Sequence, residues 1–105
     1  MTNPTTLLAL AERCEQAAGP DAGLDLAIWK ALSEMPGFKH PSPIWRFDVT
    51  ESLDAAVTLV PEECGWMVMN SAAKVGVWPS HGATPALALC AAALRARAAM
   101  VHPAG

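Results

Sequence analysis

The residues best suited to chemistry stand in the turn Ser80-His81-Gly82-Ala83-Thr84, which directly precedes an expected helix. The free amides and the dipole of a helix N-terminus attract anions. A serine, a histidine and a capping threonine at that point could therefore hold a phosphate or a carboxylate. An ordinary solvated turn would contain the same residues, so an anion site at Ser80, His81 and Thr84 remains one of two interpretations.

No other group of side chains has the spacing of a catalytic or metal site. His40 and His102 have no Cys, Asp or Glu at ligand spacing. Glu62 and Glu63 are adjacent, and neighbouring side chains point apart on most backbones, which does not suit paired acid and base catalysis. GxSxG, GxGxxG and GxxxxGK patterns are absent from the sequence. We therefore expect no catalytic residues, no metal, no cofactor and no enzymatic activity.

The tryptophans and methionines are candidates for contact with another protein, because tryptophan anchors interfaces and methionine adapts to varied surfaces. Trp29, Trp45, Met67 and Met69 are the expected interface residues. Trp66 and Trp78 are instead expected to pack the sheet against helices.

The composition favours one domain with apolar surface to cover. A length of 105 residues suits a single domain, residues 1–105. Hydrophobic residues make up 52% of the chain and charged residues only 16%, which favours self-association or a protein partner. The net charge is −3 and the basic residues are scattered, which argues against nucleic acid as a partner.

Several features predict a location in the cytoplasm. The N-terminus MTNPTTLLALAERC lacks the pattern of a signal peptide, and Arg95 and Arg97 interrupt the longest apolar stretch. Cys14, Cys64 and Cys90 are widely spaced and odd in number, which fits reduced thiols better than a disulfide framework. No membrane partner is expected.

Hydrophobic periodicity predicts about four helices. The first begins at Asn3-Pro4 and ends at Gly19, and the second begins at Pro20-Asp21 and carries an apolar stripe to Met35. The third is short, begins after Thr50 or Ser52, and ends at Pro61. The fourth follows Thr84-Pro85.

The fourth helix lies in the segment ATPALALCAAALRARAAM, residues 83–100, and is apolar most of the way round. Such a helix is usually buried on more than one side. We expect it to lie against the sheet, with other helices beside it.

Two short runs predict an antiparallel hairpin: WMVMN (66–70) and KVGVW (74–78), joined by residues 71–73. Residues 44–49 alternate and predict a further short strand. The expected fold is α+β, with a small antiparallel sheet sandwiched by the helices.

Three segments carry a resemblance to a known family: LLALAERCEQAAGPDAGLDLAIWKAL (7–32), SLDAAVTLVPE (52–62) with a tryptophan four residues later, and ATPALALCAAALRA (83–96). Together they resemble the phage ABA sandwich domain, a family of small phage and prophage proteins of unknown activity. The resemblance implies an alpha/beta/alpha layered sandwich and a phage origin. It brings no catalytic residues.

The function expected from the sequence is that of a phage or prophage accessory protein that acts by non-catalytic binding. It would form a homo-oligomer or capture a host protein, with inhibition of host defence as a hypothesis. The alternative is a small-ligand sponge that sequesters an anionic nucleotide or metabolite at residues 80–84. RNA binding is a third possibility, against which the acidic balance argues.

Overall fold

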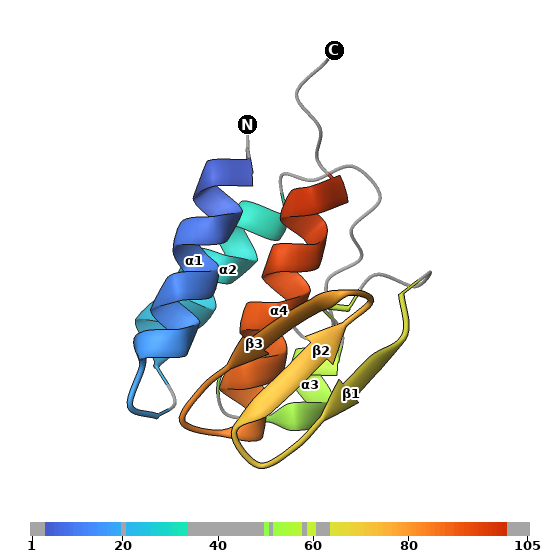
Figure 1. Ribbon diagram of the computed structural model, residues 1–105. Coiled ribbons are helices and arrows are strands. Elements are labelled where there is room, and N and C mark those ends of the chain that lie inside the picture. The colour runs from blue at the N-terminus through green and yellow to red at the C-terminus, as the bar shows by residue number, and fades with distance from the viewer. Residues whose placement is uncertain are drawn as a thin grey trace.

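The computed structural model describes residues 4–19, 21–33, 50, 52–57, 59–60 and 64–100. Along these residues the elements are α1 (Pro4–Gln16), α2 (Ala22–Ser33), α3 (Leu53–Val57), β1 (Trp66–Val68), β2 (Ala72–Val75), β3 (Trp78–His81) and α4 (Pro85–Met100) (Figure 1). The expected α+β class is confirmed. The described part has three helices of 12 to 16 residues and one of five, so "about four" is slightly too many for full-length helices. The strand expected at 44–49 lies outside the described residues.

Helix α4 is the centre of the fold. Every residue from Ala86 to Leu94 is buried. Helix α1 lies along one side of α4, and the sheet and α3 pack against other sides (Figure 1). The helix begins as expected, because the Thr84 Oγ1 accepts a hydrogen bond from the Leu87 amide at 3.1 Å. The predicted placement of the alanine-rich helix against the sheet is therefore confirmed.

Helices α1 and α2 supply the other side of the core. Their buried residues are Leu7, Leu10, Ala11 and Cys14 on α1 and Leu24, Ile28, Ala31 and Leu32 on α2. Ala17, Ala18 and Ala27 also recur at helical spacing in the sequence, but Ala18 is exposed and Ala17 and Ala27 are only half-buried.

Thr50 is tied to the start of α2 by hydrogen bonds. It is fully buried, its amide donates to Asp25 Oδ1 at 2.8 Å, and its Oγ1 accepts from the Asp21 amide at 2.9 Å. The Asp21 carboxylate also accepts from the Leu24 amide at 3.1 Å and so caps α2. This capping explains why α2 begins where the sequence predicts.

The sheet has the order β1-β2-β3, and both strand pairs are antiparallel. The predicted hairpin is present, with Met67 opposite Lys74. The connection lies two residues earlier than predicted, at residues 69–71, where the Met69 amide donates to the Ala72 carbonyl at 2.7 Å.

The predicted second strand, 74–78, is wrong at its C-terminal end. Gly76, the first central residue of the turn, has a φ of 60°, whereas the φ of Val77, the second, is not positive. This combination is typical of a type II′ turn. Val75 therefore pairs with Trp78 across this turn, and Trp78 begins β3. Residues 79–81 were expected in a turn but form this edge strand, where Pro79 needs no amide donor on its open side.

The described helices cover one face of the sheet rather than both. Ala73, Val75 and Ser80 are buried, whereas Met67, Lys74 and Pro79, which lie one residue out of step with them, are exposed. Because strand side chains alternate between faces, the first set points to the helices and the second set points away. Among the described residues the layers are therefore sheet, α4, then α1 and α2, and not helices on both sides of a sheet.

No helix in the described part of the chain combines the length and apolar character needed to cross a bilayer.

Candidate functional site

The structure places the three predicted anion-site residues at the junction of β3 and α4. Ser80 and His81 end β3, and Thr84 caps α4. The Ser80 Oγ is buried and accepts a hydrogen bond from Arg95 Nε at 3.0 Å. The hydroxyls of Ser80 and Thr84 thus both have partners within the chain, and an anion bound there stays a prediction.

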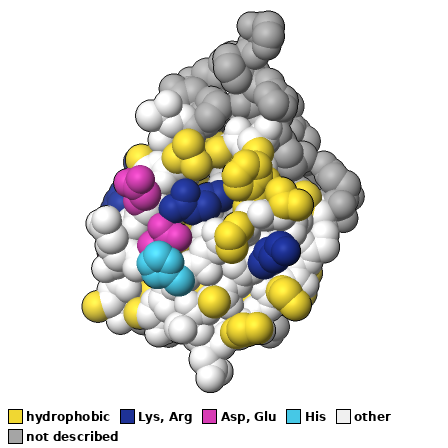
Figure 2. Space-filling view, viewed as in Figure 1, with side chains coloured by type: hydrophobic (Ala, Val, Ile, Leu, Met, Phe, Trp, Pro, Cys, Tyr) yellow, Lys and Arg dark blue, Asp and Glu magenta, His cyan; other side chains and the backbone are white. Residues whose placement is uncertain are grey.

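An ion-pair cluster surrounds the buried serine. Arg95 Nη2 lies 2.6 Å from Glu15 Oε1, and His81 Nδ1 lies 3.6 Å from Glu15 Oε2. The Glu15 side chain is only 13% exposed, whereas that of His81 is 74% exposed. Acidic, basic and histidine side chains gather at one place on the face shown in Figure 2. An external anion would compete with Glu15 for Arg95, so the cluster favours a structural role over ligand capture.

Sequence reasoning missed this cluster. In the sequence, Arg95 and Arg97 stand out only as charges that interrupt an apolar stretch. In the structure Arg95 reaches β3 and α1, and Arg97 donates from Nε to the Leu59 carbonyl. No local sequence pattern predicts the pairing of Arg95 with Glu15.

The outward face of the sheet, hereafter the outer face, consists of two rows of residues. One row crosses the strands as Met67, Lys74 and Pro79, and the other as Met69, Ala72 and His81. Met67 is 57% and Met69 66% exposed, although buried methionine is far more usual. The predicted interface residues Met67 and Met69 therefore share one exposed surface.

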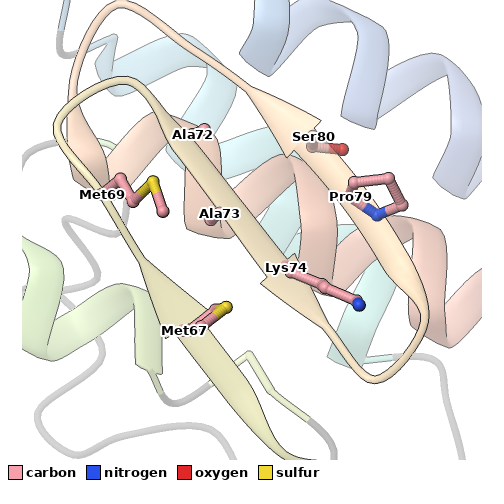
Figure 3. A pocket seen from close by; sticks show the side chains of 7 residues that line it. All are labelled: Met67, Met69, Ala72, Ala73, Lys74, Pro79 and Ser80. Carbon is pink, nitrogen blue, oxygen red and sulfur yellow. The ribbon is translucent and has the colours of Figure 1, made fainter.

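A shallow pocket opens on the outer face. Its lining residues are Met67, Met69, Ala72, Ala73, Lys74, Pro79 and Ser80. Figure 3 shows that Met67 and Met69 come from the β1 side, Lys74 from the central strand β2, and Pro79 from β3. The pocket is thus almost entirely apolar, with the amine of Lys74 as its charged group.

Lys74 has no ion-pair partner among the described residues. It is exposed and lies between Met67 and Pro79 in its row. The outer face therefore offers one positive charge within apolar surroundings.

The other predicted interface residues do not join this surface. Trp29 is half-buried on α2 and packs against the core. Figure 1 shows α2 on the far side of α1 and α4 from the sheet. Trp45 lies outside the described residues.

Trp66 and Trp78 pack less completely than predicted. They are 46% and 41% exposed, and Val77 in the adjoining turn is 75% exposed. Trp66 and Trp78 flank Val75 on the helix-facing side of the sheet. Their exposed parts therefore lie at the Gly76–Val77 end of the sheet, on the side opposite to the outer face.

Cys14 and Cys90 are buried in the core. A hydrogen bond with the Cys14 thiol and then burial raise the pKa of Cys90 well above its usual range. A thiol held protonated is a poor nucleophile, so this pair suits packing better than catalysis.

Within the described ranges, no group of three or more His, Cys, Asp or Glu side chains is placed to hold a metal ion. No family model, no curated protein and no solved structure matches this chain.

Proposed function

We propose that this protein acts by non-catalytic binding of another protein through the outer face of its sheet. The observation that carries the proposal is the exposure of Met67 and Met69, at 57% and 66%, beside Pro79 and around an apolar pocket. Clustered exposed apolar side chains commonly mark interaction sites, and flexible methionines adapt to a partner's shape.

We also propose a biological setting: a phage or prophage accessory protein that acts in the bacterial cytoplasm. Its partner would be a second copy or a host protein, and for the second case we propose inhibition of host defence as the role. Support comes from the family resemblance of residues 7–32, 52–62 and 83–96, from the small size, and from a hydrophobic fraction of 52%.

Site-specific photo-crosslinking in the producing bacterium tests the binding proposal. The photoreactive residue p-benzoylphenylalanine would replace Met69 on the outer face or, as a control, Thr5, which is exposed on α1. We expect a discrete crosslinked species from position 69 and none from position 5. Mass spectrometry of that species would show whether the partner is a second copy or a host protein.

A result that contradicts the proposal is an equal yield of adducts at positions 69 and 5. Substitution of Met67 by Ser in the same chain provides a second check, because it removes apolar contact area while leaving the core intact. We expect the position 69 adduct to weaken in this variant.

The small-ligand sponge is a less favoured alternative. Its proposed site depends on Ser80 and Thr84, whose hydroxyls are engaged by Arg95 and by the Leu87 amide. Native mass spectrometry of protein purified from bacteria would test it, since a bound nucleotide adds mass that a Ser80→Ala/His81→Ala variant should lose.

A further inference from the structure

We infer that the partner of the outer face is a different protein, which presents a carboxylate among apolar side chains to Lys74. This inference rests on the proposed function, since it specifies what binds on the same surface. It starts from the position of Lys74 on the central strand, with Met67 and Pro79 on either side (Figure 3).

Binding on this face would remove the Lys74 amine from water. An ammonium group that loses its hydration without gaining an acceptor is costly to bury. The described residues of the outer face contain no carboxylate, because the rows consist of Met67, Lys74 and Pro79 and of Met69, Ala72 and His81. Because the described residues of this face supply no such acceptor, we infer that it comes from the partner, and a carboxylate makes the strongest such hydrogen bond.

The same charge argues against a second copy as the occupant. Two copies stacked face to face about a two-fold axis at Lys74 would bring their ammonium groups together. Like charges at an interface are unfavourable. Glu15 lies near the rim of the face through its contact with His81, but its carboxylate is held by Arg95 at 2.6 Å. A different protein with its own carboxylate avoids the repulsion between two Lys74 ammonium groups and does not depend on Glu15.

The apolar surroundings define the rest of the partner. Met67, Met69 and Pro79 offer flexible and flat apolar surface around Lys74, which is the charged residue of the pocket lining. Aromatic or aliphatic side chains on both sides of the carboxylate would fill this pocket and exclude water from the ion pair. The expected motif is therefore an Asp or Glu flanked by large apolar residues.

A charge-reversal selection tests the inference. Random peptides displayed on a carrier would be selected in parallel against the intact protein and against its Lys74→Glu variant. We expect peptides selected on the wild type to contain Asp or Glu beside apolar residues. Those selected on Lys74→Glu should contain Lys or Arg at the same place.

Affinities would then be measured by calorimetry with the most enriched wild-type peptide and its Glu→Gln (or Asp→Asn) form. We expect Lys74→Glu to weaken the acidic peptide about tenfold or more, the range for loss of a charge-assisted hydrogen bond. Arg13→Glu is the matched control, because Arg13 is exposed on α1 and the change in net charge is identical. It should leave the affinity nearly unchanged.

The outcomes separate this inference from the proposed function. Peptides that bind the outer face, as shown by loss of binding in Met67→Ser/Met69→Ser, but without an acidic preference would overturn the acidic motif and leave protein binding intact. A dimer of this chain that the same double variant dissolves would overturn the choice of partner, again with the proposed function upheld. Failure to select any peptide or detect any dimer that depends on Met67 and Met69 would overturn both.

Discussion

Arg95 on α4 and Glu15 on α1 meet at 2.6 Å although 80 positions separate them in the chain. The same guanidinium donates from Nε to the Ser80 hydroxyl at 3.0 Å. One side chain thus joins the central helix to a flanking helix and to the edge strand of the sheet. Because both partners are largely shielded from water, this contact is stronger than an ordinary surface ion pair.

Loss of this contact should destabilise the fold. We expect Arg95→Ala to lower the free energy of unfolding by about 1–3 kcal/mol, because the shielded Glu15 carboxylate loses its strongest partner. Urea unfolding followed by circular dichroism measures the change. Arg13→Ala, which removes an exposed charge from α1, serves as the control. Equal effects of the two substitutions would contradict the structural role of Arg95.

Gly82 should tolerate no side chain. A Cβ atom at this position would lie 2.7 Å from the Ala88 amide nitrogen and 3.0 Å from the Leu87 Cβ, so the backbone of α4 would have to move. We expect Gly82→Ala to cost about 1–3 kcal/mol of stability, as overpacking does. Gly65→Ala is the matched control, because nothing lies within 4 Å of its added Cβ. A thermal unfolding midpoint of Gly82→Ala as high as that of Gly65→Ala would refute the close approach.

The alanines of α4 should resist enlargement. Ala92 is fully buried in the helix that contacts α1, α3 and the sheet, so a leucine there has no space. We expect Ala92→Leu to destabilise the protein by about 1–3 kcal/mol. Ala99 lies near the end of the same helix and is only half-buried, so Ala99→Leu should be nearly neutral. Chemical unfolding of both variants compares them directly, and tolerance of Leu at 92 would show a looser core.

Alkaline pH should weaken the fold through Cys90. The Cys14 thiol and burial raise the pKa of Cys90 in the folded state, so the unfolded chain releases a proton that the folded chain retains. The free energy of unfolding is therefore undiminished below the ordinary thiol pKa and falls as the pH rises above it. Urea titrations across this range measure the slope. Cys90→Ala should reduce the slope, Cys64→Ala should not, and equal slopes in both variants would exclude Cys90 as the cause.

The helices were predictable because their signals are local. Thr84 and Pro85 mark the start of α4, Asp21 caps α2, and the spacing of Leu24, Ile28 and Leu32 fixes the buried side. These signals act over three or four residues, which is the range that a sequence pattern can report.

The strand boundaries were less predictable for a physical reason. Val75, Val77 and Trp78 all favour extended structure, so residues 74–78 read as one strand. Gly76 permits the positive φ that makes the turn, but nothing in the sequence requires it. Contacts with the rest of the chain determine where the strand ends, because the turn allows β3 to reach α4 and places Ser80 beside Arg95.

The candidate site likewise has a part that was predictable from local patterns and a part that was not. Alternation along β1 places Met67 and Met69 on one face, and that face is exposed in the structure. The contact of Glu15 with Arg95 depends on how α1 packs against α4, which no short-range pattern reports. The partner of the outer face stays a prediction.

The central position of α4 also sets the order in which the protein can fold during synthesis. The ribosome makes α1, α2 and all three strands before residues 85–100, yet α1 and the sheet have their main contacts with α4. The leucines of α1 therefore lack their main packing partner until the last helix has been synthesised. Contacts between such distant segments form slowly and leave nascent chains prone to aggregation. We therefore expect a chaperone that binds the early helices to raise the yield of folded protein. The gain should be larger than for a protein in which segments close in sequence pack together as they are synthesised.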